Sequence, residues 1–343
     1  MKLSQPALLS VLDLSVLTEG ATSSDALRDT TALAVRADQL GYLRFWVAEH
    51  HNMPSVACTS PALLIAHIAA LTKRIHVGSG GVMLPNHAPL VVAEQFAMLE
   101  ALHPGRIDVG IGRAPGTDQG TAAALRRSAD ALGAEDFPRH LLDVMCLLGD
   151  DRTELGWGNN LAVGFRATPV AASFPGVFLL GSSGYSAELA GHLGLPFGFA
   201  HHFDTGGTLQ AIELYRQSFK PSAALPEPYV IVTVNVLAAE SAEDADWHSA
   251  PGRLTALGRR TGRFTPLISP AAAAMHPNLD EAMRLPSNRI VGEVSQVIEN
   301  LHGLGDRTGA DELMVTAVAY DLSARVRSLE LLAEYWPKRD FVL

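Results

Sequence analysis

Apolar positions along the chain follow two alternating spacings. Short runs rich in β-branched and aromatic residues recur through the sequence, and most are followed by a segment whose apolar residues return every three or four positions. The first spacing is typical of buried strands and the second of amphipathic helices. The runs predict eight strands, at 8–14, 43–48, 75–79, 107–111, 177–181, 197–200, 229–237 and 312–318.

The alternation of strands and helices indicates a parallel sheet, because a crossover helix returns the chain to the same edge of the sheet. Eight such units in 343 residues predict an α/β fold, a closed TIM (β/α)8 barrel that forms a single domain, 1–343. Two stretches interrupt the alternation and are interpreted as insertions, at 114–176 before the fifth strand and at 241–288 between the seventh and eighth strands. A helix over 128–148 is expected within the first insertion, and the second is rich in proline.

Two predicted helices are apolar on nearly all sides. They begin at Pro61 and Pro89, whereas the helix expected to begin near Ser24 and Asp25 and to stop at Gly41 is apolar on one face only. A helix that is apolar all round needs a cover besides the barrel. We therefore expect the helices after Pro61 and Pro89 to form a homodimer interface.

The net charge, the cysteine content and the length of the apolar runs exclude several kinds of binding partner and structural site. The net charge is −10 at pH 7 and no concentrated basic face is evident, which argues against nucleic acid or a membrane surface as a partner. Cys58 and Cys146 show no paired spacing, so neither a disulfide framework nor a zinc ribbon is indicated. No apolar run approaches the roughly 20 residues of a membrane span, and a cytoplasmic protein is expected.

Three consecutive predicted strands end in residues with distinctive chemistry. His50 follows the second strand, Gly80 and Gly81 follow the third, and Arg113 follows the fourth. The carboxyl ends of parallel strands meet on one rim, which is where barrels of this class place their active sites. Position alone makes His50 and Arg113 candidates for chemistry, although a rim histidine can also serve only to bond the backbone.

Several motifs in this region resemble one known family. They are VAEHH at 47–51, GSGG at 78–81, LPNHAP at 84–89, EQFAMLEALHPGR at 94–106 and GIGRAPG at 110–116. In this order they resemble the bacterial-luciferase-like family of flavin-dependent monooxygenases. The resemblance implies an enzyme that uses reduced FMN and O2, through a flavin peroxide adduct, to oxygenate a small organic substrate, with a separate flavin reductase supplying the flavin.

The same resemblance assigns roles to the rim residues. It implies that His50 moves a proton, that Gly80 and Gly81 lie beneath the flavin ring and are often joined by a cis peptide, and that Arg113 holds the FMN phosphate. Hydroxyls at a predicted helix start favour the same anion, because the helix dipole is positive there: Ser182, Ser183 and Ser186. Four further side chains are expected to line the substrate side, namely His87, His201, His202 and Phe203.

Other interpretations of these residues remain open. The serines can be ordinary helix caps and the glycine pair a plain turn, and relatives with the same fold use the deazaflavin F420 or are non-catalytic flavin-binding subunits. The two histidine pairs, 50–51 and 201–202, suggest a metallohydrolase, but neighbouring strand residues point to opposite faces, and no metal is expected. The glycines at 110–116 do not open a helix directly, which disfavours a dinucleotide site. An oxidation in secondary metabolism is the expected use.

Overall fold

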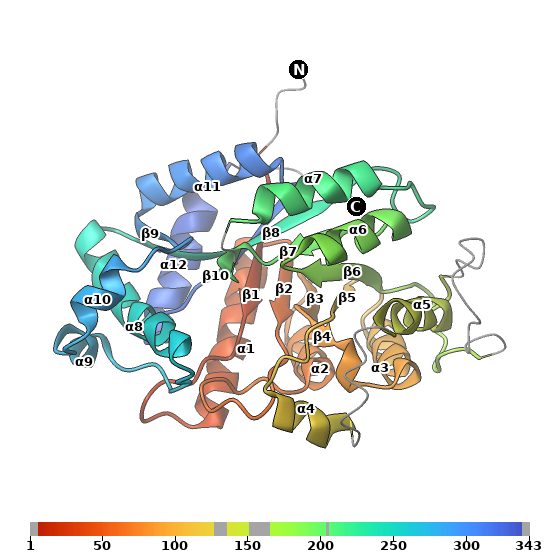
Figure 1. Ribbon diagram of the computed structural model, residues 1–343, viewed down its shortest axis with the longest axis horizontal. Coiled ribbons are helices and arrows are strands. Elements are labelled where there is room, and N and C mark those ends of the chain that lie inside the picture. The colour runs from red at the N-terminus through yellow and green to blue at the C-terminus, as the bar shows by residue number, and fades with distance from the viewer. Residues whose placement is uncertain (1–5, 127–135, 151–164, 204–205, 338–343) are drawn as a thin grey trace.

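Eight parallel strands close into a barrel in the computed structural model, which describes residues 6–126, 136–150, 165–203 and 206–337 (Figure 1). The last barrel strand pairs with both the first and the seventh, so no strand edge is left open. This closure confirms the predicted TIM barrel. The eight strands are β1 Leu8–Asp13, β2 Arg44–Val47, β3 His76–Ser79, β5 Ile107–Gly112, β6 Gly176–Gly181, β7 Phe197–Phe199, β8 Val230–Ala239 and β10 Glu312–Thr316.

Two short strands extend the sheet at its carboxyl edge. β4 (Val82–Met83) pairs with the end of β5, and β9 (Ile290–Glu293) pairs with the end of β8. The sequence did not predict either strand, because runs of two and four residues are too short to show a period. Both matter for the site, since β4 positions the segment that holds His87 and β9 positions Arg289.

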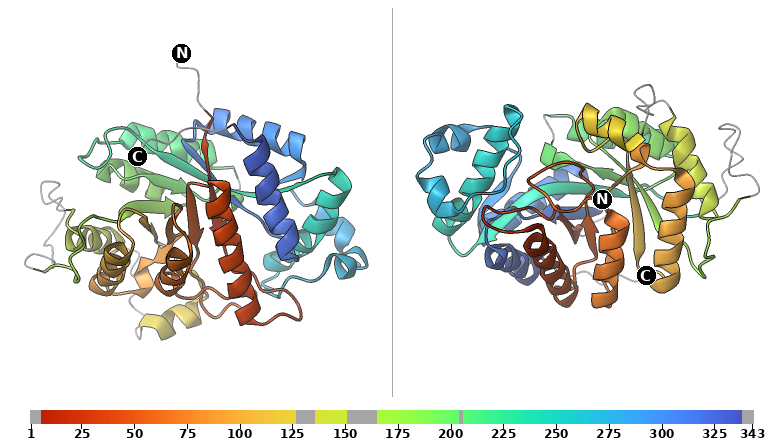
Figure 2. Two further views of the ribbon diagram at one scale, coloured as in Figure 1. Left: turned by 180° about the vertical axis from the view of Figure 1, so that it is seen from behind. Right: turned by 90° about the horizontal axis from the view of Figure 1, so that it is seen from below.

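Helices surround the barrel on its outer face (Figure 2). Among the described residues, no helix is both long enough and apolar enough to cross a membrane. The helices that follow barrel strands in the repeating pattern are α1 Ser23–Leu40, α2 Pro61–Leu71, α3 Pro89–Leu102, α6 Gly184–Leu193, α7 Thr208–Ser218, α11 Val294–Thr308 and α12 Leu322–Tyr335. Two single-turn 3₁₀ helices, η1 Leu84–Asn86 and η3 His201–Phe203, lie at the barrel mouth.

The start of α1 differs slightly from the prediction. Thr22, and not Ser24 or Asp25, caps the helix: the Thr22 side chain accepts from the Asp25 amide, and the Asp25 side chain accepts from the Thr22 amide. This reciprocal pair satisfies two amides that the first turn leaves unpaired. The helix ends at Gly41, in a left-handed conformation with φ of 84°, as the sequence predicts.

The first insertion contains two helices in its described part, α4 (Gln119–Arg126) and α5 (Phe137–Leu147). The predicted helix over 128–148 therefore overlaps α5. Its segment 128–135 lies outside the described residues, as does 151–164 later in the same insertion. α5 packs against α3 and contacts η1, so this part of the insertion lies outside α3.

The second insertion contains three helices that were not predicted, because its proline-rich composition obscures the helical period. They are α8 (Ala242–Arg260), α9 (Pro270–Ala274) and α10 (Leu279–Arg284). The three lie together on one side of the barrel (Figures 1 and 2), and α8 contacts β8 and β9. The insertion thus forms a small helical subdomain beside the carboxyl ends of the last strands.

Buried polar groups fill the amino end of the barrel. Arg44 Nη1 lies 2.9 Å from Asp108 Oδ2, and Arg44 Nε lies 3.0 Å from Glu312 Oε2. The Trp46 indole donates to the same Asp108 oxygen at 2.9 Å and packs edge-on against Phe178. These contacts close the barrel from below, so the open space lies at the carboxyl ends of the strands.

Candidate active site

A cavity opens at the carboxyl ends of the barrel strands, where the sequence analysis placed the chemistry. Its lining combines residues from the ends of β2, β3, β5, β6 and β7 with Thr233 of β8 and apolar side chains of the barrel interior. Nine of the eleven predicted site residues line it, which brings together segments more than 100 residues apart in the chain. They are His50, Gly80, Gly81, Arg113, Ser182, Ser183, Ser186, His202 and Phe203.

The glycine pair forms one wall of this cavity. The peptide between Gly80 and Gly81 is cis. A Cβ atom on Gly80 would lie 2.6 Å from Cδ1 of Leu12, and one on Gly81 would lie 2.7 Å from the carbonyl oxygen of Gly110. Neither glycine has a side chain to project into the cavity, so this wall is smooth and lets a flat group approach the backbone.

His50 lies where β2 leaves the barrel. Its amide donates to the Cys58 carbonyl at 3.1 Å, while its imidazole lines the cavity. Nδ1 is buried and has no hydrogen-bond partner among the described residues. Burial lowers the pKa of His50, and the positive charge of Arg259 lowers it further. The imidazole is therefore neutral near pH 7 and has a nitrogen available to a ligand.

His202 and Phe203 form a second wall from η3. Their rings lie 4.0 Å apart between centres, tilted by 45°. Nδ1 of His202 lies 3.4 Å from the carbonyl oxygen of Thr233, and burial lowers the pKa of His202 to about 4. The cavity thus presents two neutral imidazoles and an aromatic ring, a combination suited to an organic molecule.

Arg113 and the start of α6 form the cationic end of the cavity. The guanidinium carbon of Arg113 lies 4.3 Å from the centre of the Tyr185 ring, and no ion pair joins Arg113 to a carboxylate of the described residues. Ser183 is the N-cap of α6, yet its side chain makes no capping hydrogen bond. The first amides of a helix are unpaired and carry partial positive charge, so this end is suited to an anion.

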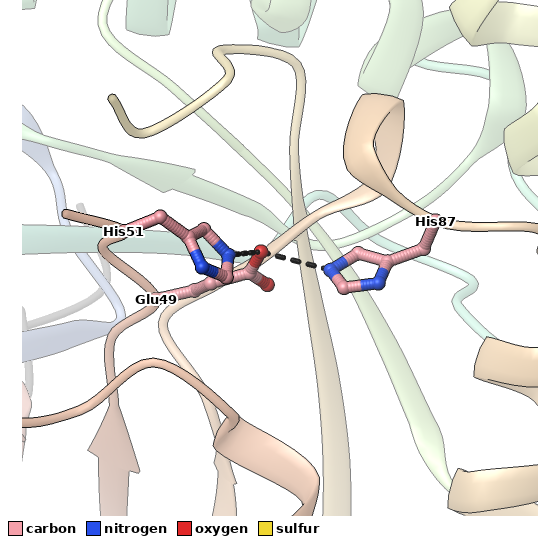
Figure 3. A group of neighbouring side chains, drawn as sticks. All are labelled: Glu49, His51 and His87. Carbon is pink, nitrogen blue, oxygen red and sulfur yellow. Dashed lines mark hydrogen bonds and ion pairs between the residues drawn. The ribbon is translucent and has the colours of Figure 1, made fainter. Parts of the chain in front are cut away.

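Glu49 anchors the loops around the cavity (Figure 3). Its carboxylate is fully buried. Oε1 lies 2.8 Å from Nε2 of His51 and 2.8 Å from Nε2 of His87. The other oxygen, Oε2, accepts a hydrogen bond from the Met83 amide at 3.0 Å. Burial opposes ionisation, but hydrogen bonds from His87, then His51 and Met83, outweigh it and lower the pKa of Glu49. The carboxylate is therefore charged and fully engaged.

The same three side chains have donor atoms that metals favour. Both imidazole Nε2 atoms, however, are directed at the same carboxylate oxygen of Glu49 at hydrogen-bond distance, so the three groups satisfy one another without an ion. We interpret the group as a structural connection between the loops after β2 and β4. Asn86 and Thr117 extend it to the loop after β5, through bonds to Pro115 O (2.9 Å) and His51 O (2.8 Å).

Two predicted substrate-lining residues do not line the cavity. The ring of His87 is directed toward Glu49 instead. His201 Nδ1 lies 2.7 Å from Oγ1 of Thr208 at the start of α7, so its ring is also turned aside. In both cases a specific polar partner outside the cavity determines the side-chain direction, which strand position alone does not predict.

Three residues of the site were missed in the sequence analysis. Tyr185 lies between two predicted serines, and its aromatic ring next to a proposed anion site was the available signal. Glu49 enters the sequence analysis only as part of the VAEHH motif. Arg259 comes from the second insertion and has no motif around it, so only the fold brings its charge close to His50 and His202.

Comparisons with known proteins agree with this geometry. A family model described as luciferase-like monooxygenase matches residues 9–312. A luciferase-like monooxygenase of Escherichia coli (strain K12) is 41% identical over 329 residues, covering 94% of this chain and 95% of the relative. An N-acetyl-S-alkylcysteine monooxygenase of Bacillus subtilis (strain 168) is 39% identical over 249 residues, covering 70% of each chain.

Solved structures share the fold. The crystal structure of apo-MsnO8 superposes with a TM-score of 0.86 at 37% identity, covering 96% of this chain and 98% of that chain. Two more distant structures share the fold. The oxygenating constituent of 3,6-diketocamphane monooxygenase, in complex with FMN, has a TM-score of 0.71 at 20% identity, covering 96% of this chain and 97% of that chain. An F420-dependent secondary alcohol dehydrogenase, in complex with an F420–acetone adduct, has a TM-score of 0.64 at 16% identity, covering 96% of this chain and 98% of that chain. With the family model matched over most of its length, this chain belongs to the luciferase-like monooxygenase family.

Proposed function

We propose that this protein is a monooxygenase that uses reduced FMN and O2 to oxygenate a small organic substrate. The observation that carries the proposal is one cavity whose wall combines a cationic end, a smooth glycine wall and a neutral histidine. Each of these features suits one part of FMN or of its chemistry: the phosphate, the flat ring and the proton.

The residues fit FMN. Arg113, with its forked donors, and the start of α6 with Ser182, Ser183 and Ser186 would hold the phosphate. The wall at Gly80 and Gly81 would admit the ring, since neither residue has a side chain to occupy that part of the cavity. The buried Nδ1 of His50, without a partner among the described residues, would meet a polar group of the ring or of the substrate.

Reduced FMN, when bound, supplies the two electrons with which O2 is activated. The protein's own contribution is to bind, exclude water and manage a proton. Leu12, Trp46 and Met314 make the cavity apolar, which excludes water from a reaction that is sensitive to it. His50, held neutral near pH 7, would accept and return a proton at Nδ1. The helices of the second insertion would cover the mouth.

We propose that a separate flavin reductase supplies the reduced FMN. A dinucleotide-binding loop leads directly from a strand into a helix. After β5, by contrast, the chain passes through Pro115 and begins α4 only at Gln119, so its glycines do not form such a loop. An NADH site within the described residues is therefore not supported by this segment.

We further propose a homodimer formed through α2 and α3. Apolar side chains of both helices are exposed on the outside of the barrel, including Leu63 (74%), Met98 (53%) and Leu102 (64%). The two helices are neighbours, and exposed apolar side chains gathered on one part of a surface are typical of protein interfaces. From the sequence alone, these two helices were already expected to be covered by a second copy of the chain.

F420 is the alternative cofactor, because a structure of the same fold contains it. We favour FMN since two relatives that are about 40% identical over 70% or more of the chain are named as monooxygenases, whereas the F420 structure is only 16% identical. The test supplies the purified protein with reduced FMN or reduced F420 and an N-acetyl-S-alkylcysteine thioether, under ¹⁸O₂. Incorporation of the label into an oxygenated product with FMN supports the proposal. Turnover with F420 that consumes no oxygen would refute it.

A further inference from the structure

Two arginines of the second insertion, and a third that directly follows it, lie near one another where α8 meets the start of β9. Arg253 and Arg259 belong to α8, and Arg289 directly precedes β9. No ion pair joins any of the three to a carboxylate of the described residues. In a chain with a net charge of −10, three cations that form no ion pair with a described carboxylate are unexpected and point to an anion from outside the chain.

Arg289 is held rigidly at the rim. Its guanidinium lies against Gly252 of α8, where a Cβ atom would be 2.6 Å from Nη2 and 2.8 Å from Nη1. On either side of it, Asn288 donates to the His201 carbonyl at 3.2 Å and Ile290 pairs with Val236. Arg289 is thus fixed between the insertion and the end of β8, next to the segment that supplies His202.

One nitrogen of this guanidinium has no partner. Nη1 of Arg289 is buried and forms no hydrogen bond with the described residues. Arg253, in contrast, is engaged, since its Nη2 donates to the carbonyls of Met283 and Leu285, both at 2.6 Å. Burying an unpaired donor costs about 1–3 kcal/mol, a cost that a bound acceptor would remove.

Arg259 connects this group to the cavity. It lies two turns beyond Gly252 on the face of α8 that contacts Arg289, and its charge lowers the pKa of His50 and of His202, both of which line the cavity. The side chain is exposed to solvent and is therefore accessible to a ligand. Burial, and then the charges of Arg253 and Arg259, lower the pKa of Arg289 to about 10.

We propose that Arg259 and Arg289 form a binding site for the carboxylate of an organic substrate, at the His50 and His202 side of the cavity mouth. This inference rests on the proposed function, because it places the substrate in the same cavity as the flavin. The flavin phosphate has its own cationic site at Arg113 and α6, so the second site is left for the substrate. A planar guanidinium matches a carboxylate with two parallel hydrogen bonds, and a pair of them would select acids over neutral analogues.

The test compares benzoate with benzamide, which have nearly the same shape but differ in charge. Both are titrated calorimetrically into the purified protein, with and without FMN. We expect benzoate to bind at least tenfold more tightly than benzamide. Arg259→Gln and Arg289→Gln should each reduce this preference about tenfold, whereas Arg260→Gln, an exposed neighbour on α8, should leave it unchanged. Arg289→Lys keeps the charge and should retain part of the preference for benzoate. This variant shows whether a loss of the preference in Arg289→Gln reflects misfolding.

Two results would overturn the proposal. One is equal binding of benzoate and benzamide by the parent protein, or a preference that survives in both glutamine variants. The other is a loss of FMN affinity in Arg259→Gln or Arg289→Gln, which would assign these arginines to the flavin phosphate. If the parent protein does not bind FMN at all, the proposed function fails. The preference for benzoate over benzamide, measured without FMN, still decides whether the carboxylate site exists.

Discussion

The guanidinium of Arg113 is stacked on the ring of Tyr185, with 4.3 Å between the guanidinium carbon and the ring centre. Arg113 follows β5 and Tyr185 lies in the first turn of α6, so this contact joins two loops that are separate in the sequence. A ring face holds a guanidinium by its plane and leaves the edge with its N–H donors available. The contact therefore orients Arg113 for the anion that α6 also favours.

Removal of this ring should weaken flavin binding modestly. We expect Tyr185→Ala to reduce the affinity for reduced FMN about two- to fivefold, since an exposed cation–π contact contributes about 0.5–1 kcal/mol. Tyr185→Phe keeps the ring and should bind as the parent does. Anaerobic titration followed by flavin fluorescence measures both. Equal affinities in Tyr185→Ala and the parent would show that the stacking does not serve the phosphate site.

The Glu49 carboxylate should contribute strongly to stability. Glu49→Ala leaves two imidazoles and the Met83 amide without their shared acceptor, so we expect the free energy of unfolding to fall by about 3 kcal/mol. Glu49→Gln keeps one acceptor oxygen and should lose less. Urea denaturation measures these values, with Glu188→Ala on the exposed face of α6 as the control. A change below about 0.5 kcal/mol in Glu49→Ala would mean that the loops are held by other contacts.

His202 should make the protein sensitive to mild acid. Its pKa is about 4 in the folded protein, against an ordinary value of 6.5, so protonation favours the unfolded chain. Stability is then fully present above pH 6.5 and is lost progressively as the pH falls toward 4. Between pH 7 and 4.5 this single group accounts for about 2–3 kcal/mol. His202→Gln, which cannot titrate, should lose that much less stability over the same range in urea denaturation, and an identical loss in both proteins would contradict the assignment.

The proposed dimer depends on the apolar face of α2. Leu63→Glu adds a charge to a side chain that is 74% exposed, so the isolated subunit should fold normally while the interface is disrupted. We expect sedimentation analysis to show a dimer for the parent and a monomer for Leu63→Glu. Leu209→Glu, at a 53% exposed position on α7, should remain a dimer. A monomeric parent protein would remove the basis of this prediction.

The barrel was predictable because its strands are buried on both faces and therefore appear as continuous apolar runs. The predicted strand at 177–181, for example, differs from β6 by one residue. The N-cap of α1 was harder to predict, because Thr22, Ser24 and Asp25 are all good capping residues. Thr22 takes this position because it forms reciprocal hydrogen bonds with Asp25. The helices of the second insertion were missed because their prolines, one of them inside α8, mask the period.

The site was predictable as far as the backbone determines it. Parallel strands must end on the same rim, so His50, Gly81 and Arg113 were expected to meet there, and they line one cavity. Side-chain direction was not predictable in the same way. His87 turns toward Glu49, and the charge of Arg259 reaches the cavity only because α8 packs beside β8.

The central claim is that Arg113 holds the phosphate of FMN. It is tested most directly by the dissociation constant of reduced FMN for Arg113→Ala, measured anaerobically, with Arg284→Ala on the exposed face of α10 as the control. Loss of a charged hydrogen-bonding partner costs about 1.5–3 kcal/mol, so we predict that Arg113→Ala binds about ten- to a hundredfold more weakly while the control is unchanged. Equal affinity of Arg113→Ala and the parent protein would contradict the account.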